Sequence, residues 1–339
     1  MVDRFLIAGG SEVLVGRGFP RPLLPERAGR ERVAMLVQPG SRSVAARAAA
    51  GVDLPVLEVE LPDREAAKDL DTVGSVYRRL ADAGIGRHDT LIGVGGGAAT
   101  DVAGFVAATW LRGVEWVAVP TTMLGAVDAS LGGKTGINLG GKNLVGAFWQ
   151  PSRVVIDLDV LDGLPLELLR EGSAESLKAG YVADRELVEI YEREGLAAPL
   201  ELVVPRAVAV KVAVVSEDFR ETGRRAILNF GHTIGHAVER MCGLPHGHAV
   251  AVGMVAAAEI SRERHGFDAA RLRTSVARLG LPTHVTACDA DQAMELIDLD
   301  KKRDASGVRM VLLRDVGEPV VEPVTAPEVL VALAAIGAI

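Results

Sequence analysis

Short apolar runs alternate with longer amphipathic stretches through the first half of the chain. The runs are rich in Val, Leu or Ile and bounded by Gly, Pro or Asp, which is typical of strands buried on both faces of a parallel sheet. A helical pattern, such as that over Lys68–Ala83, separates neighbouring runs. This alternation predicts an α/β domain with an open, Rossmann-like parallel sheet. The expected strands are Val33–Val37, Pro55–Val59, Thr90–Val94, Trp116–Val119 and Arg153–Asp157.

The pattern changes after Leu158. Apolar residues then recur at three- and four-residue spacing, which predicts helices such as Thr233–Arg240 and Val250–Arg264. We therefore predict an α/β N-terminal domain over residues 1–160, followed by a mostly α-helical C-terminal domain over residues 161–339. A short strand pair is expected within the second domain, at Arg309–Leu313 and Pro319–Val321.

Charge and composition narrow the class of protein. The 339 residues carry a net charge of −8 and no visible basic stripe, so no nucleic-acid partner is expected. The start of the chain lacks the pattern of a signal peptide, and the longest apolar stretch, Ala249–Ala258, is too short to span a bilayer. Cys242 and Cys288 form no CxxC pattern, and two isolated thiols suggest a reducing compartment. We expect a cytoplasmic protein without a membrane partner.

A glycine-rich turn follows the third expected strand. Gly95-Gly96-Gly97 leads into a helical pattern, so the backbone can approach a phosphate at a helix N-terminus. The spacing is not GxGxxG, and from this stretch alone a tight turn without a ligand is an equally good interpretation. Thr121 and Thr122 follow the next strand, at the carboxyl edge where open α/β sheets bind ligands, and this favours a binding site.

Two Gly-Gly-Lys turns lie close together further along the chain. Gly132-Gly133-Lys134 and Gly140-Gly141-Lys142 each present an ammonium group beside flexible backbone. Such groups suit anionic oxygens, so we favour anion binding over solvated surface lysines.

Histidines gather in one part of the helical domain. His232 and His236 are four residues apart and share one face of a helix, and His246 follows shortly after. Zincins use this spacing, but Thr233 stands where their general-base Glu would be, so a protease is a poor interpretation. With an acidic residue from elsewhere these histidines could form a three-ligand metal site with an open position. Spacing alone leaves open which three residues bind.

These motifs together resemble the dehydroquinate synthase family, and they follow one another in the family's order over nearly the whole chain. They are Gly95–Asp101, Gly104, Arg112-Gly113, Pro120–Thr122, Asp128, Gly132–Gly136, Gly141–Asn143, Gly146–Phe148, Gln150-Pro151, Ala174-Glu175, Lys178, Lys211, Arg225, Asn229, Gly231-His232, Gly235-His236, His246-Gly247 and Asp300–Lys302.

The resemblance implies an NAD-binding domain, a helical domain and a site in the cleft between them, in a homodimer. It implies zinc, or cobalt, bound by Glu175, His232 and His246, with His236 facing the substrate instead of the metal. NAD would contact an acidic-to-Lys stretch, the glycine-rich turn and three further segments. The implied NAD-binding residues are Asp63, Glu65, Lys68, Gly97, Ala98, Ala99, Thr100, Asp101, Thr121, Thr122, Lys134 and Lys142.

The implied substrate is a small phosphorylated sugar acid. Its phosphate and carboxylate would meet Arg112, Lys134, Asn143, Lys211, Arg225, Asn229, His236 and Lys302. Arg112 is expected to act in the partner's site. We assign catalytic roles to Asp128 and Lys178 as groups that orient hydroxyls, to Lys134, and to His236 as a proton carrier, because an imidazole titrates near neutrality.

The family reaction converts 3-deoxy-D-arabino-heptulosonate 7-phosphate into 3-dehydroquinate and phosphate in the shikimate pathway. One alternative is an aminodehydroquinate synthase or another sugar-phosphate cyclase of secondary metabolism. A second is a metal-dependent alcohol or glycerol dehydrogenase, which would release NADH, and a third is a non-catalytic binding protein. The last is disfavoured because every expected ligand position is retained.

Overall fold

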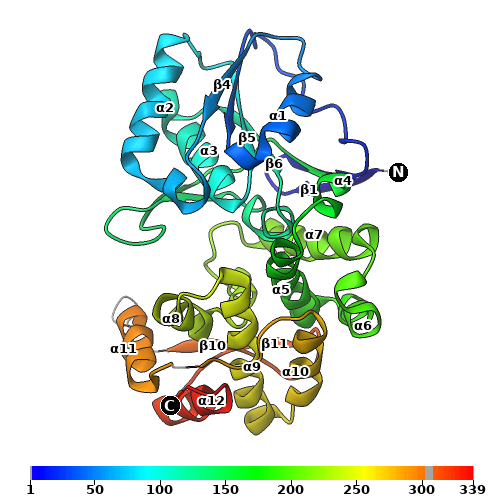
Figure 1. Ribbon diagram of the computed structural model, residues 1–339, viewed down its shortest axis with the longest axis vertical. Helices are drawn as coiled ribbons and strands as arrows, with labels where there is room; N and C mark the ends of the chain where they lie inside the picture. The colour runs from blue at the N-terminus through cyan, green and yellow to red at the C-terminus, as the bar shows by residue number, and fades with distance from the viewer. Residues whose placement is uncertain (1, 287, 302–307, 339) are drawn as a thin grey trace. The chain divides into compact units, whose positions relative to one another are not determined.

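The computed structural model describes residues 2–286, 288–301 and 308–338. The chain packs into two compact units (Figure 1). The N-terminal unit comprises residues 1–165 and 211–220, and the C-terminal unit comprises residues 166–210 and 221–339. An α/β unit and a mostly helical unit were predicted from the pattern, and this fold class is confirmed. The functional domains at residues 1–160 and 161–339 stay a prediction.

A seven-stranded sheet forms the centre of the N-terminal unit, in the order β1-β2-β9-β6-β5-β3-β4. All neighbouring strands run parallel except β1 and β2, which pair antiparallel. The five predicted strands are confirmed within a residue or so, whereas β1 and β2 were not predicted. The bounds are β1 Val2–Ile7, β2 Ser11–Gly16, β3 Val33–Val37, β4 Val56–Glu60, β5 Thr90–Gly95, β6 Glu115–Pro120 and β9 Arg153–Asp157.

Helices cover both faces of this sheet (Figure 1). On one face Val44 and Ala48 of α1 (Arg42–Ala49) belong to a buried cluster with alternate residues of β3. On the other face α3 (Gly97–Thr109) packs against β5 and β6. Because both faces are covered, β3, β5 and β9 are buried throughout, which explains their continuous apolar sequence.

The remaining elements of this unit are the helix α2 and several shorter segments. Strands β7 and β8 pair as a two-stranded antiparallel ribbon, and a short π-helical segment, η4, contains Asp128. The bounds are η1 Pro39–Ser41, η2 Arg64–Lys68, α2 Leu70–Asp82, η3 Trp110–Arg112, η4 Gly125–Ala129, β7 Lys134–Ile137, β8 Val145–Phe148 and α4 Leu158–Asp162.

The second half of α7 (Leu200–Glu217) belongs to the N-terminal unit. The hydroxyl of Ser216 accepts a hydrogen bond from the backbone N–H of Ala8 at 3.0 Å. Phe219, just beyond the helix, packs edge-on against Phe148 with ring centroids 5.7 Å apart. These contacts join residues far apart in sequence, so no local sequence pattern predicts them.

The C-terminal unit is built around α9, whose residues are buried over most of its length. The predicted helices are confirmed as α8 and α9, and the predicted strand pair as antiparallel β10 and β11. The bounds are α5 Leu166–Ala183, α6 Arg185–Glu194, η5 Gly195–Ala197, η6 Arg224–Asn229, α8 His232–Cys242, α9 His246–His265, α10 Ala269–Arg278, α11 Ala290–Lys301, β10 Arg309–Leu313, β11 Pro319–Pro323 and α12 Ala326–Ala335.

Helices α8 and α9 pack with their backbones nearly in contact. A Cβ atom added at Gly253 of α9 would lie 1.9 Å from the carbonyl oxygen of Gly231 and 2.7 Å from the nitrogen of Gly235. Neither partner atom belongs to a flexible side chain, so only a shift of one helix could relieve the clash. Glycine at these positions therefore sets the distance between the two helices.

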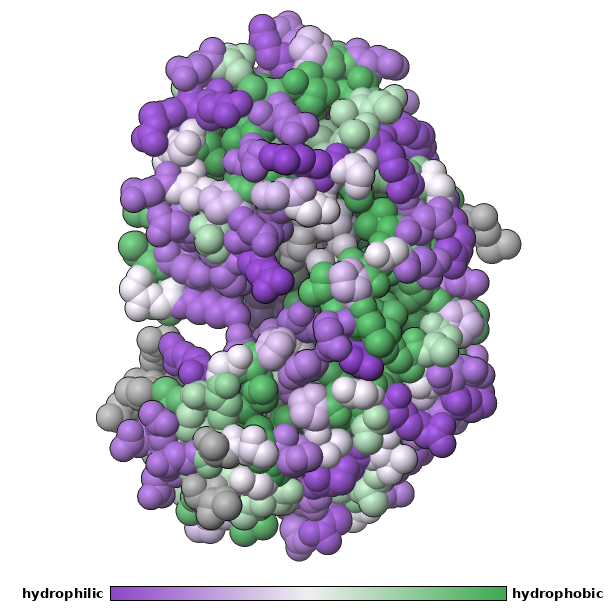
Figure 2. All heavy atoms as spheres, viewed as in Figure 1, coloured by the Kyte–Doolittle hydropathy of each residue, from purple (hydrophilic) through white to green (hydrophobic). Residues whose placement is uncertain are grey.

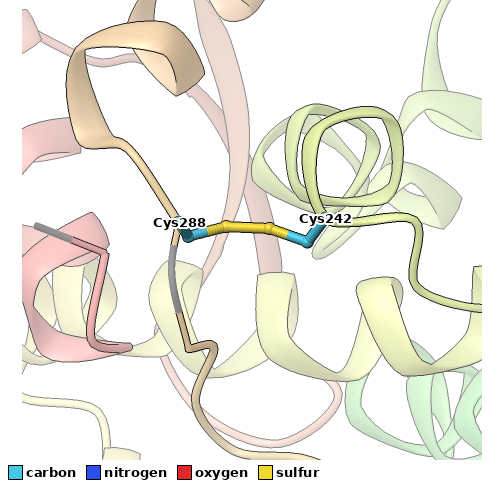
Figure 3. The surroundings of a disulfide bond; sticks show 2 residues. All are labelled: Cys242 and Cys288. Carbon is cyan, nitrogen blue, oxygen red and sulfur yellow. A yellow bond between two sulfur atoms is a disulfide. The ribbon is translucent and has the colours of Figure 1, made fainter.

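A disulfide joins Cys242, at the end of α8, to Cys288 before α11 (Figure 3). The two Cα atoms lie 6.4 Å apart, although 46 residues separate the cysteines in sequence. The prediction of two isolated thiols is therefore wrong, because the fold brings together residues whose spacing carries no pairing signal. The cysteines accordingly give no support to a reducing compartment.

Polar residues cover much of the face drawn in Figure 2, and apolar residues form several patches between them. Among the described residues, Leu6 of the edge strand β1 is the most exposed of the large apolar side chains, at 69%. In the described part of the chain, no helix combines the length and apolar character that a membrane span requires.

We predict opposite effects for two glycine-to-alanine changes in helices. Gly253→Ala should destabilise the protein by about 2–3 kcal/mol, because the new methyl group meets backbone atoms of α8. Gly74→Ala in α2 should stabilise it by up to about 1 kcal/mol, because its methyl group meets only the end of the Arg78 side chain, at 3.8 Å. Melting temperatures of the two purified variants and the parent check this. A Gly253→Ala protein as stable as Gly74→Ala would contradict the close helix packing.

Candidate metal centre and anion-binding residues

Three side chains from separate helices converge in the C-terminal unit. Glu175 lies in α5, whereas His232 and His246 are the first residues of α8 and α9. Oε1 of Glu175 lies 3.5 Å from Nε2 of His232 and 3.4 Å from Nε2 of His246. These three ligand atoms are close enough together to hold one metal ion.

Close helix packing brings His246 to this place. A Cβ atom on Gly247 would lie 2.1 Å from the carbonyl oxygen of Glu171, which is one turn before Glu175 in α5. Only glycine therefore lets the first turn of α9 approach α5 so closely. The His-Gly pair in the sequence thus has a physical reason, since the glycine provides the approach that the histidine needs.

The outer edge of each imidazole already has a hydrogen-bond acceptor. Nδ1 of His232 lies 3.2 Å from the carbonyl oxygen of Phe230, and Nδ1 of His246 lies 2.8 Å from Oε2 of Glu239. Because both partners accept, each Nδ1 carries the proton. In the neutral rings the lone pairs are then on Nε2 and point toward Glu175. Two such nitrogens and one carboxylate are a donor set that suits zinc or a similar divalent cation, so these residues fit a catalytic metal site.

Glu175 is a buried charge that its neighbours stabilise. Its side chain is about 1% exposed and pairs with Lys178 one turn further along α5. Burial by itself would raise its pKa, but Lys178, His232 and His246 outweigh burial and hold the pKa of Glu175 well below its usual value. The carboxylate is therefore ionised at neutral pH and ready to bind a cation.

The two histidines differ in basicity. Burial and the neighbouring charge of Lys178 lower the pKa of His232 to about 3, so its ring is neutral at pH 7. Burial also opposes the charge on His246, but hydrogen bonds to Glu175 and Glu239 prevail and raise its pKa to about 9. A cation that binds here must displace a proton from His246, so its affinity is expected to increase with pH up to that value.

Other predicted substrate-binding residues lie in the same unit. His236 is exposed on α8, with its ring centroid 5.2 Å from that of His232 and 6.0 Å from that of His246. Arg225 in η6 is 1% exposed. Asn229 ends η6 and donates a hydrogen bond to Glu221 at 2.9 Å. The sequence analysis missed Glu221. In the structure this residue has a backbone φ of 57°, which nothing in the sequence indicates.

In the N-terminal unit the glycine-rich turn connects β5 to α3. Gly96 is the N-cap of α3, and the helix begins at Gly97. The first N–H groups of a helix have no partner within it, so they are available to an anion. Side chains at the turn would be crowded, because a Cβ atom on Gly95 would lie 2.5 Å from Cβ of Ala99. The turn thus fits the close approach of a pyrophosphate.

Two neighbouring side chains fix the surroundings of this turn. Thr121, at the end of β6, shares a hydrogen bond with Ser41 at 2.9 Å. Oε1 of Gln38 accepts a hydrogen bond from the N–H of Gly96 at 3.3 Å, while its Nε2 donates to the carbonyl of Arg64 at 3.2 Å. The sequence analysis missed Gln38, although it directly follows a predicted strand and such positions line ligand sites in open sheets.

Lys68 connects two of the predicted binding segments. Its ammonium group, 3% exposed, donates to Asp101 at 2.5 Å and to Asn143 at 2.8 Å. Burial raises the pKa of Asp101 to about 6 although Lys68 opposes this. Asn138 holds the same loop, since it donates to Glu65 at 3.0 Å and accepts from the N–H of Asn143 at 2.9 Å. Lys68, Asp101 and Asn143 are therefore brought together as one network.

The other predicted site residues of this unit lie outside the Lys68 network. Asp128 and Lys211 form an ion pair between η4 and α7. Lys134 and Lys142 are exposed, as is Asp63. Arg112 is exposed in a turn where Leu111, Arg112 and Gly113 all have positive φ, of 50°, 67° and 121°. Lys302 lies outside the described residues.

Comparison with known proteins identifies the family. The family model for the 3-dehydroquinate synthase N-terminal domain matches residues 58–171, and that for the C-terminal domain matches residues 172–303. The chain is 46% identical to 3-dehydroquinate synthase from Corynebacterium efficiens over 327 residues, which cover 91% of this chain and 89% of the relative. The chain belongs to the 3-dehydroquinate synthase family.

Solved structures of similar proteins extend this finding. A 2-deoxy-scyllo-inosose synthase complexed with carbaglucose-6-phosphate, NAD⁺ and Co²⁺ has a TM-score of 0.87 and 27% identity, covering 98% of this chain and 99% of that chain. A 2-epi-5-epi-valiolone synthase from Streptomyces hygroscopicus with NAD⁺ and Zn²⁺ bound has a TM-score of 0.87 and 28% identity, with 98% of each chain covered. The predicted family and its sugar-phosphate cyclase fold are thus confirmed for this 3-dehydroquinate synthase family member.

We predict that His232→Ala abolishes the binding of a stoichiometric divalent cation. The change removes one of three ligands and leaves Glu175 facing only Lys178 and His246. Metal analysis after dialysis against a weak chelator checks this. His265→Ala, the same change at the last residue of α9, removes an ion pair with Glu322 and should retain the metal. Full metal content in the His232→Ala protein would contradict the site.

Proposed function

We propose that this chain is a 3-dehydroquinate synthase in the strict sense, a phosphate-eliminating carbon–oxygen lyase. It would convert 3-deoxy-D-arabino-heptulosonate 7-phosphate into 3-dehydroquinate and phosphate. The observation that carries the proposal is the convergence of Glu175, His232 and His246 in a chain of this family. The same chain presents a helix N-terminus after a glycine turn and a set of cationic side chains that suit an anionic substrate.

The proposed cofactors are NAD and a divalent cation, zinc or cobalt. Similar proteins have been solved with NAD⁺ and Co²⁺ or Zn²⁺, and the residues here fit both groups. When bound, NAD supplies a hydride acceptor that is regenerated within the turnover, and the cation supplies a Lewis acid that lowers the pKa of a substrate hydroxyl. The cation ligands would be Glu175, His232 and His246.

NAD would bind the first domain, residues 1–160, and the cation and substrate would bind the second, residues 161–339. The helix N-terminus at Gly97 and Ala98 would bind the pyrophosphate. The network of Lys68, Asp101 and Asn143 would hold the surrounding loops in one arrangement before the cofactor arrives. The full proposed set is Asp63, Glu65, Lys68, Gly97–Asp101, Thr121, Thr122, Lys134 and Lys142.

Cationic and amide side chains would fix the two anionic ends of the substrate. Arg225 is buried, and a buried guanidinium group with its fixed fork of donors suits a carboxylate. Asn229 adds a neutral donor near it, four residues further along η6. Recognition of a carboxylate favours a heptulosonate over a neutral sugar phosphate. The other proposed contacts are Arg112, Lys134, Asn143, Lys211, His236 and Lys302.

Orientation and proton transfer would complete the residue roles. Lys178 is held by Glu175, and Asp128 by Lys211, so both side chains have defined positions from which to bind ring hydroxyls. His236 is exposed beside the cation ligands, and its imidazole could receive or return a proton near neutral pH. Lys134 would contact both cofactor and substrate phosphate.

A substrate assay separates this function from its alternatives. Enzyme loaded with cation and NAD should release phosphate from 3-deoxy-D-arabino-heptulosonate 7-phosphate without net formation of NADH, because the hydride returns to the product. Phosphate release and nicotinamide absorbance measure the two quantities in one cuvette. Faster turnover of the amino analogue would favour an aminodehydroquinate synthase. A steady increase in NADH would instead favour an alcohol or glycerol dehydrogenase.

We further propose a homodimer in which Arg112 enters the partner's site. The positive φ values at Leu111 and Arg112 hold this turn away from regular helix, and Leu111 is 38% exposed beside it. An exposed apolar side chain next to an exposed guanidinium group suits a contact with another subunit better than with water.

Mixing two inactive variants tests whether Arg112 acts in trans. Arg112→Ala and His232→Ala should each lose most activity alone. After subunit exchange about half of the dimers are mixed, and one of their two sites has both residues intact, so about a quarter of the parental activity should return. Unmixed samples are the control. Absence of recovery in demonstrably mixed dimers would contradict action in trans.

A further inference from the structure

Glu239 contacts the cation-ligand set without belonging to it. It lies in α8 seven residues after His232 and three after His236, so all three side chains share one face of the helix. Its side chain is 17% exposed, and its Oε2 atom lies 2.8 Å from Nδ1 of His246. No motif noted in the sequence includes Glu239.

The turn between α8 and α9 produces this contact. Gly243 ends α8 with a left-handed backbone conformation, and its N–H donates to the carbonyl of Glu239 at 3.1 Å. Pro245 is the N-cap of α9, and His246, its first residue, lies beside the last turns of α8 instead of beyond them. The chain reversal thus places a carboxylate against one edge of the imidazole, while Glu175 faces the other edge at 3.4 Å.

The two nitrogens of the His246 ring face different partners. Nε2 faces Glu175, where the cation would bind, and Nδ1 is left to donate its proton to Glu239. Partners of this kind fix the tautomer and ring orientation of a ligating histidine and increase its basicity toward the metal. His232 has only a backbone carbonyl in the equivalent place, at 3.2 Å. The stronger, charged acceptor is therefore on His246.

We propose that Glu239 is a positioning residue that orients His246 for cation binding through the Nδ1 hydrogen bond. The inference rests on the cation site proposed above. A competing arrangement exists, because His236, Glu239 and His246 also form a group of possible ligands. We favour the first arrangement because it uses the Nε2 edge of His246, which faces the buried carboxylate of Glu175 together with Nε2 of His232.

Two substitutions distinguish a positioning carboxylate from a ligand. Glu239→Ala removes the acceptor, whereas Glu239→Gln keeps an oxygen that can accept from Nδ1 but is a poor metal ligand. We expect the dissociation constant for Zn²⁺, measured by competition with a chelating dye, to increase about 10- to 100-fold in Glu239→Ala. Glu239→Gln should recover most of this loss. The visible spectrum of the Co²⁺-loaded proteins should keep the band positions and intensities of the parent, because the ligands are unchanged.

Glu259→Ala is the matched control. Glu259 also has a side chain that is 17% exposed, and it pairs with Arg262 and Arg273 toward the other end of α9. Its removal should leave cation affinity within a few-fold of the parent. Melting temperatures of the cation-free proteins show whether any variant has lost its fold. If Glu239→Ala does not fold, Glu239→Gln decides, since an affinity loss of a few-fold with an unchanged Co²⁺ spectrum supports the inference.

Two results would overturn the proposal. One is a parental Zn²⁺ affinity in a folded Glu239→Ala protein, or in Glu239→Gln where the alanine variant does not fold. Another is equal loss in Ala and Gln variants together with an altered Co²⁺ spectrum, which would make Glu239 a ligand. The His232→Ala protein, titrated with Zn²⁺ in parallel, distinguishes failure of the proposed role of Glu239 from failure of the proposed cation site. Binding lost there but retained in Glu239→Ala refutes only the role of Glu239, whereas binding retained in both refutes the cation site itself.

Discussion

The structure of the helical unit depends on one buried carboxylate, that of Glu175. A buried ionised group is costly unless other charges and hydrogen bonds surround it. Lys178 and two imidazoles provide these contacts, but the imidazoles come from other helices. Helices α5, α8 and α9 must therefore approach closely, and Gly253 and Gly247 make that approach sterically allowed. Packing and electrostatics thus impose the same geometry, and the convergence of three ligands is its result.

A second buried charge organises the α/β unit in a similar way. Lys68 is almost fully buried, and its ammonium group joins Asp101 of α3 to Asn143 between β7 and β8. Asp101 lies one turn into the helix that begins at the glycine-rich turn, so the pair fixes that turn relative to the loop after β7. Segments that seem independent in the sequence are thus joined through the ammonium group of Lys68.

The sequence predicted those features whose cause is local. Continuous apolar runs indicated β3, β5, β6 and β9, because strands buried on both faces need few polar positions. The edge strand β4 was also predicted, although it carries two glutamates and only Val59 is buried. Strand β1 was missed because it lies at the sheet edge and mixes exposed charged and apolar residues. The disulfide and the pairing of Lys211 with Asp128 were beyond local reasoning, since they join distant segments. Glu175 was likewise found by resemblance, because nothing in its own helix marks it as a ligand.

The candidate site adds a more specific lesson about spacing. His232 and His236 are the pair that helical periodicity offers, yet the atoms nearest to Glu175 belong to His232 and His246. Both of these are first residues of their helices, so the ends of helices, and not the face of one helix, present the ligands. The periodicity of apolar residues describes one helix at a time. It cannot predict that the turn Gly243–Pro245 reverses the chain direction between α8 and α9. That turn also brings Glu239 to His246, so a single chain reversal supplies both a proposed ligand and the carboxylate proposed to orient it.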